Sequence, residues 1–248
     1  MNWLDHVEKW KDCQRCPLGQ QRSNICLARG TVPCDVLFIG EAPGVSEDTF
    51  GLPFVGPAGQ LLDQIILRTI PSPDLSIWDR LGMHLSTPWW VVLDTAKEQG
   101  LVIMETVWIT HALTNLVACF PRNAKTIGEN EPEYDEILEC QPRLIEFVNL
   151  AQPKLIVCVG KLAANYVDHG DTVTCVDIDH PAYILRMSIA QRQMATQKCI
   201  VVLRNAVEDI LNTTKPFRNW GENKDASSKT HRENLRNTYG FDGSDIPY

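Results

Sequence analysis

An acidic loop bounded by glycine and proline is the part of this chain best suited to bind a small molecule. It runs from Gly40-Glu41-Ala42-Pro43-Gly44 through Glu47 and Asp48 to Pro53-Phe54-Val55-Gly56. The loop follows an apolar run and precedes a helix-like segment, and open α/β sheets bind their ligands in loops at the ends of strands. Because it contains no Lys or Arg but offers the ring of Phe54, it predicts a pocket for a flat, neutral, polar ring rather than for a phosphate group.

Nine cysteines are the second source of chemistry. Cys13-Gln14-Arg15-Cys16 is a C-x-x-C on a predicted turn, which can present two thiolates to one metal centre. Cys119 and Cys140 are the best candidates for further ligands, since both lie beside prolines that we expect at loop-to-helix junctions. This spacing is compatible with a structural zinc site, an iron–sulfur cluster or a redox pair. The remaining cysteines are predicted to be structural thiols: Cys26, Cys34, Cys158, Cys175 and Cys199.

Composition limits the class of protein. The 248 residues are 44% hydrophobic and 22% charged, which suits one large domain or a domain with an appendage. No segment approaches the roughly 20 apolar residues of a membrane-spanning helix, and the N-terminus lacks the form of a signal peptide. We therefore expect a cytoplasmic protein in a reducing compartment, where clustered cysteines indicate metal or redox chemistry. The net charge of -8 argues against broad, non-specific binding to nucleic acid.

Alternating apolar and amphipathic segments predict the elements that position these residues. Strands are expected at Val36–Ile39, at Thr106–Thr110 leading into Asn115, at Leu155–Gly160, and at Val173–Ile178 leading to His180. Helices are expected at Trp3–Lys11, Gly59–Ile70, Pro132–Leu150, Lys161–Val167 and Ser188–Asn212. This order predicts an α/β fold of three layers (αβα) with a mostly parallel four-stranded central sheet. Residues 1–213 would form one domain with a helical insertion at about 71–105, and residues 214–248 a polar, flexible tail.

Four motifs occur in a fixed order. The first is the loop from Gly40 to Gly56, and the second is Asn115-Leu116-Val117-Ala118-Cys119 with Asn123. The third is Cys140-Gln141-Pro142-Arg143-Leu144 with the strand up to Gly160, and the fourth is His180-Pro181-Ala182-Tyr183-Ile184-Leu185-Arg186. Together, from Cys13 to about Ile210, they resemble the family-four, iron–sulfur uracil-DNA glycosylases.

That resemblance implies a DNA repair hydrolase with a 4Fe-4S cluster. Its ligands would be Cys13, Cys16, Cys119 and Cys140. The reaction implied is base excision: uracil is flipped out of DNA, at a cost of a few kcal/mol, and its N-glycosidic bond is hydrolysed to leave an abasic site. The implied partner is single- or double-stranded DNA that contains uracil, bound by a monomer.

Binding roles follow from the same resemblance. Phe54 would stack on the flipped base, and Asn115 would read its edge, because one carboxamide both accepts from a ring N–H and donates to the neighbouring carbonyl. Gly40 and Asn123 would complete the substrate site.

Catalytic roles would belong to His180, Glu41 and Glu47. His180 would stabilise charge on the departing uracil anion, and the two carboxylates would position water or stabilise a cationic sugar.

DNA contacts would come from the motif that follows His180. Tyr183 and Leu185 would wedge into the vacated base stack, and Arg186 would meet a phosphate. Ile184 would either join this wedge or pack on the core.

Three departures from the family pattern keep other functions open. Ala118-Cys119-Phe120-Pro121-Arg122 lacks the basic residue usual before the third cysteine, Ala182 replaces a frequent serine, and the insertion contains Trp78, Trp89 and Trp90. Ala42 also stands where better-known uracil glycosylases have an aspartate, a feature shared with the family-four enzymes. The alternatives are a catalytically divergent DNA- or partner-binding module of the same fold, a glycosylase for another modified pyrimidine, and a zinc-stapled protein of unrelated function.

Overall fold

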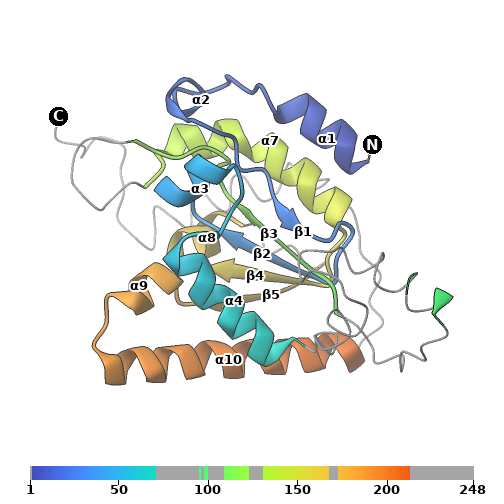
Figure 1. Cartoon of the computed structure of the whole chain (residues 1–248), viewed down its shortest axis with the longest axis vertical. Helices are drawn as coiled ribbons and strands as arrows, with labels where there is room; N and C mark the ends of the chain where they lie inside the picture. Colours follow the sequence, from blue (N-terminus) through green and yellow to red (C-terminus); the bar gives the residue numbers. More distant parts are fainter. Residues whose placement is uncertain are drawn as a thin grey trace.

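A five-stranded sheet lies at the centre of the molecule, with helices on both of its faces (Figure 1). The computed structural model describes residues 2–70, 95, 98–99, 109–122, 131–167 and 173–212. The strands are β1 (Arg29–Gly30), β2 (Val36–Gly40), β3 (His111–Asn115), β4 (Leu155–Val159) and β5 (Thr174–Ile178), in the spatial order β1-β3-β2-β4-β5. All neighbours pair in parallel except β1, which runs antiparallel to β3.

The central strands form where the sequence is apolar without interruption. All five residues of β2 and all five of β4 are buried, as expected for strands covered by helices on both faces. Four parallel strands confirm the predicted α/β class, and the two-residue edge strand β1 is an addition that we did not predict. The register pairs Val36 with His111 and puts β3 at His111–Asn115. The strand predicted at Thr106–Thr110 was therefore wrong at Ile109 and Thr110, which precede β3, and its residues 106–108 lie outside the described part of the chain.

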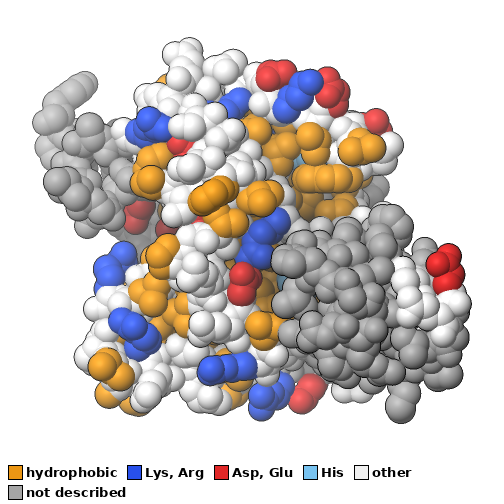
Figure 2. Space-filling model, in the orientation of Figure 1, with side chains coloured by type: hydrophobic (Ala, Val, Ile, Leu, Met, Phe, Trp, Pro, Cys, Tyr) orange, Lys and Arg blue, Asp and Glu red, His pale blue; other side chains and the backbone are white. Residues whose placement is uncertain are grey.

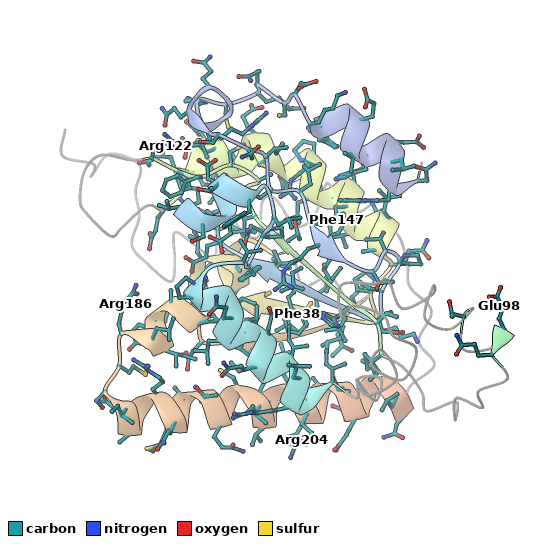
Figure 3. All side chains as sticks on the ribbon, viewed as in Figure 1. Phe38, Glu98, Arg122, Phe147, Arg186 and Arg204 are labelled. Atoms are coloured by element: carbon teal, nitrogen blue, oxygen red, sulfur yellow. The ribbon has the colours of Figure 1, made fainter. Side chains whose placement is uncertain are left out.

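Helices cover the sheet in two layers. They are α1 (Trp3–Trp10), α2 (Leu18–Gln21), α3 (Val45–Phe50), α4 (Pro57–Thr69), α7 (Tyr134–Ala151), α8 (Lys161–Tyr166), α9 (Pro181–Leu185) and α10 (Ile189–Asn212). Figure 1 shows α1 and α7 on one side of the sheet and α4, α9 and α10 on the other. The apolar core is divided accordingly: one cluster includes Phe38 and lies toward α4 and α10, and the other includes Phe147 and lies toward α7 (Figure 3).

Local signals explain where several helices begin and end. The side chain of Asn2 accepts a hydrogen bond from the backbone N–H of Asp5 (3.0 Å) and caps α1, as N-cap residues commonly do. Pro57 starts α4, at a position where its missing N–H costs nothing. Helix α3 ends at Gly51, whose φ of 71° suits glycine. Neither α3 nor α9 was among the helices predicted from the sequence.

Two predicted regions fall largely outside the described residues. These are the insertion at about 71–105, of which only residues 95, 98 and 99 are described, and the tail at 214–248. Both therefore stay predictions. Within the described part of the chain, every helix is too short or too polar to span a membrane.

Candidate functional site

The site residues meet where the parallel strands end. In Figure 1 the arrowheads of β2 and β4 point toward α3, α8 and α9. Gly40, the last residue of β2, pairs in register with Asn115, the last residue of β3. Two backbone hydrogen bonds, Leu116 N–H to Gly40 O (2.9 Å) and Val117 N–H to Glu41 O (3.3 Å), continue this pairing into the following loops. The carboxyl edge of the sheet thus brings the first two motifs together.

Gly40, Phe54 and Asn115 lie close together at the carboxyl edge of the sheet. A Cβ atom at Gly40 would lie 2.4 Å from Cζ of Phe54 and 2.5 Å from Oδ1 of Asn115, so only glycine lets the ring and the carboxamide approach this closely. Asn115 is 2% exposed, and no hydrogen bond of its carboxamide is formed within the described residues. Neither polar atom of this carboxamide is among the fully buried, unpaired side-chain atoms of the described residues, so the group keeps some access from outside. The carboxamide therefore has its hydrogen-bonding capacity available for a ligand.

Phe54 is held in a strained backbone conformation. Its φ is 57°, a left-handed value that is uncommon for a bulky residue and is often found at functional sites. The guanidinium of Arg29, on β1, donates from Nε to Pro53 O (2.8 Å) and from Nη2 to Phe54 O (3.0 Å), and also contacts Asp63 Oδ1 (2.6 Å). A Cβ atom at Gly59 would lie 1.9 Å from Phe54 O. Arg29 and the bare Gly59 together fix the loop that carries the ring, which is 6% exposed and packs in the apolar core.

Glu47 and Asp48 are buried rather than solvated. The two carboxylate oxygens of Glu47 accept hydrogen bonds from Gly44 N–H (3.1 Å) and Gly56 N–H (2.8 Å), so this side chain joins both ends of the loop. Asp48 accepts from Ser23 N–H (2.8 Å) and pairs with the guanidinium of Arg122 (2.7 Å). The two acids therefore hold backbone in place.

Glu41 and His180 meet at Gly160. A Cβ atom there would lie 2.6 Å from Glu41 Oε1 and 3.1 Å from His180 Cβ, and the φ of 97° also favours glycine. Burial, with a smaller contribution from Glu131, raises the pKa of Glu41. This is the second cluster of chemical groups at the carboxyl edge of the sheet.

The imidazole of His180 is neutral near pH 7. Burial lowers its pKa to about 4, with a smaller effect of the Arg186 cation. Its Nδ1 accepts a hydrogen bond from the backbone N–H of Ala182 (3.1 Å) at the start of α9. Because Nδ1 is the acceptor, the proton of the neutral ring lies on Nε2, which is then a hydrogen-bond donor.

Helix α9 presents the DNA-contact candidates unequally. Tyr183 is 53% exposed, Arg186 is also exposed, and Leu185 is half-buried, while Ile184 is fully buried in the core. Ile184 thus has the packing role, not the wedge role. Arg186 lies at the outer edge of the molecule beside α9 (Figure 3). Asn123 lies outside the described residues.

Four cysteines line one cavity. Cys13 and Cys16 lie on the turn between α1 and α2, Cys119 follows β3, and Cys140 comes from α7. The junction predicted for Cys140 was wrong, since α7 runs through it from Tyr134 to Ala151. All nine cysteines are free thiols. Within the described ranges, no group of three or more His, Cys, Asp or Glu side chains is placed to hold a metal ion.

Two arginines in the cavity wall lack an acidic partner. Arg22 donates from Nη1 to Cys119 Sγ (3.1 Å) and to Cys13 O (2.7 Å), and Arg143 is 1% exposed. No carboxylate of the described residues lies within ion-pair distance of either guanidinium, whereas Arg15 in the same wall pairs with Glu139 (3.2 Å). Buried cations are costly unless they are paired. The cavity is therefore suited to an anionic group bound by thiolates.

Sequence reasoning missed three arginines of these sites: Arg22, Arg29 and Arg143. Each acts on backbone carbonyls or a thiol far away in the chain. Their only sequence signal is that Arg22 and Arg29 flank apolar residues that precede β2, and that Arg143 interrupts the apolar face of a helix.

Comparison with known proteins assigns the family. Residues 29–204 match the Uracil DNA glycosylase superfamily. The chain is 31% identical over 168 residues to a type-4 uracil-DNA glycosylase of Sulfurisphaera tokodaii, covering 66% of this chain and 59% of that protein. Its identity to the type-4 uracil-DNA glycosylase of Pyrobaculum aerophilum is 32% over 154 residues, covering 62% and 58%. For that of Thermotoga maritima it is 27% over 195 residues, covering 72% and 81%.

The chain thus spans about three fifths of the length of the first two relatives. The similarity confirms the family that the four motifs indicated. Since the match extends from β1 into α10 and includes the pocket, this chain belongs to the uracil DNA glycosylase superfamily.

Proposed function

We propose that this chain is a DNA repair enzyme that excises uracil from DNA. The observation that carries the proposal is the buried, unpaired carboxamide of Asn115, which faces Gly40 beside the ring of Phe54. The relatives named above are uracil-DNA glycosylases, which supports the same activity here.

Base recognition would use Phe54 and Asn115. The Phe54 ring stacks on the flipped pyrimidine, and Asn115 accepts from the ring N–H and donates to the adjacent carbonyl. Cytosine presents the opposite pattern at these two positions, so it leaves the buried carboxamide unsatisfied. Such a mismatch separates substrates strongly, because a buried polar group loses its only partner.

Bond cleavage would depend on the leaving group. Water attacks C1′ of the deoxyribose, the C1′–N1 bond breaks, and uracil departs with the electron pair. His180 Nε2–H donates to the carbonyl oxygen on which this charge develops, and because the imidazole is already neutral it stays a donor throughout. Glu41 positions the water and takes up its proton. Glu47 acts chiefly by holding Gly44 and Gly56, and so supports the pocket from behind.

DNA would lie across α9 and the N-terminal part of α10. Residues 181–204 contain four cations, Arg186, Arg192, Lys198 and Arg204, and no carboxylate, in a chain with a net charge of -8. Figure 2 shows Lys and Arg side chains over these helices. Arg186 contacts a phosphate, and Tyr183 with Leu185 fills the space of the flipped base. Asn123 stays a candidate for orienting the substrate.

The cysteine cavity would hold a 4Fe-4S cluster on Cys13, Cys16, Cys119 and Cys140. Four observations support the fit: the four thiols share a cavity, Arg22 donates to one of them, Arg143 is an unpaired buried cation, and a Cβ at Gly19 would lie 2.7 Å from Cys13 O in the tight turn. A cluster spreads its thiolates over four irons, which suits cysteines that are not placed around a single ion. When bound, it ties three chain segments together. Thiols stay reduced inside the cell, so four free cysteines around this cavity support an intracellular enzyme.

The decisive experiment uses a labelled oligonucleotide with a single uracil and anaerobically purified protein that contains iron. Alkali-induced cleavage at the uracil, lost in Asn115→Ala and His180→Ala, is the expected result. Binding of uracil-containing DNA without an abasic product would favour a non-catalytic module. Cleavage at another modified pyrimidine alone would favour a different base range, and bound zinc in place of iron would exclude the cluster.

A further inference from the structure

We propose that Arg143 joins the cysteine cavity to the base pocket, acting as a positioning residue for Asn115 and as the counter-charge to the anionic group in the cavity. This inference rests on the proposed function. It concerns a side chain that no motif assigns to either site.

One side of the guanidinium holds the end of β3. Its Nη1 donates to Thr114 Oγ1 (2.9 Å), and its Nη2 donates to the backbone carbonyls of Asn115 (2.5 Å) and Leu116 (2.9 Å). These are the residues on which the position of the Asn115 carboxamide depends. Hydrogen bonds from a charged donor are stronger than those between neutral groups, so the guanidinium holds the end of this strand in place.

The same side chain also lines the cysteine cavity. Arg143 lines that cavity together with Cys13, Cys16, Cys119 and Cys140. Its Nε is buried and has no hydrogen-bond partner in the described part of the molecule. A sulfur of a thiolate-bound cluster is an acceptor of the kind that this N–H lacks.

The positive charge of Arg143 is also unbalanced among the described residues. Arg143 is 1% exposed and has no carboxylate within ion-pair distance among the described residues. A buried cation without a counter-charge is destabilising. A cluster held by four thiolates is anionic, and it would supply the missing charge in the cavity that Arg143 lines. Filling of the cavity and the geometry of Asn115 are therefore linked through one side chain.

The test compares Arg143→Met with Lys154→Met, since Lys154 is a half-exposed cation paired with Asp35 (2.7 Å) that does not line the cavity. In Arg143→Met the cluster should be reduced at a more negative potential, because a nearby cation and N–H donor are lost, and kcat/KM for uracil release should fall at least about tenfold. Lys154→Met should change neither quantity. A potential equal to that of the unmodified protein, or an unchanged kcat/KM, would overturn the proposal.

Hydrogen exchange tests the link without activity. Removal of the iron from the unmodified protein should speed amide exchange at 113–116, and the same treatment of Arg143→Met should change it less. An equal change in both proteins would contradict the link. If Arg143→Met does not fold, Arg143→Lys is the alternative, because it keeps the positive charge but not the several N–H donors of the guanidinium. In this variant the reduction potential should stay unchanged while kcat/KM falls. If the reduction potential and kcat/KM are both retained, the positioning role is refuted. Iron-containing protein that releases no uracil would instead refute the proposed function.

Discussion

The neutral His180 leads to a prediction about pH that differs sharply from ordinary histidine behaviour. With a pKa of about 4, about 0.1% of the side chain is protonated at pH 7 and about 3% at pH 5.5. A histidine with the usual pKa of 6.5 would be about 90% protonated at pH 5.5. Protonation of His180 should therefore leave the rate of uracil release unchanged from pH 8 to about pH 5 and lower it with a midpoint near 4.

The assay is single-turnover release of uracil from an oligonucleotide, measured from pH 4 to 8. His180→Ala should reduce the rate about 10²–10³-fold, the usual cost of losing one donor to developing negative charge. His180→Gln provides an N–H that does not titrate, and it separates the histidine from Glu41, whose own protonation also falls in the acidic range. A break near pH 6.5 that disappears in His180→Gln would refute the neutral donor.

The free energy of unfolding should also depend on the protonation of His180. Since the folded pKa lies below the unfolded value, the unfolded chain binds more protons between about pH 4 and 6.5. The contribution of His180 is complete above pH 6.5 and is lost as the pH falls through this range, by up to about 3 kcal/mol. Urea unfolding at pH 7 and pH 5 should show a smaller loss in His180→Gln than in the unmodified protein.

Three further predictions concern the loop and the DNA surface. Glu41→Gln should raise the free energy of unfolding at pH 7, because burial and Glu131 raise the pKa of this carboxyl and the charged form is disfavoured in the fold; equal or lower stability in urea would contradict this. Arg29→Ala should lower kcat/KM about 10- to 100-fold and should also lower the melting temperature by several degrees, since the backbone of Phe54 loses donors worth about 1.5–3 kcal/mol; unchanged kcat/KM would show that the loop keeps its conformation without Arg29. Arg186→Ala should weaken binding equally for uracil- and thymine-containing duplexes and reduce the salt slope by about 1; an unchanged slope would exclude a phosphate contact.

The sheet could be predicted where burial alone determines the sequence. β2 and β4 are apolar at every position because both faces and both edges are covered. β3 was misplaced because it contains His111 and Thr114, which are accommodated by specific contacts: the hydroxyl of Thr114 donates to Leu27 O (2.7 Å). Such a partner lies far away in the chain and leaves no periodic signal.

The candidate site likewise contains residues that could be predicted from the sequence and residues that could not. Strand-end reasoning placed Asn115, His180 and the Phe54 loop at one edge of the sheet, because residues that follow parallel strands converge there. The residues that hold them could not be found in this way. Arg29 and Arg143 bind backbone carbonyls, and any carbonyl in the chain is an equal candidate until the fold is known.

The geometry also indicates which half of the reaction this pocket serves best. Ala42 offers no carboxylate, and both oxygens of Glu47 already accept backbone amides, which weakens it as a base. Among the carboxylates of the described site, Glu41 remains beside His180 at Gly160, with a raised pKa that suits a base. The His180 ring, held by the Ala182 N–H at Nδ1, would need no rearrangement for its Nε2–H to meet the departing anion. Stabilisation of the leaving group should therefore contribute more than activation of water, so His180→Ala should cost a larger factor in rate than Glu41→Gln.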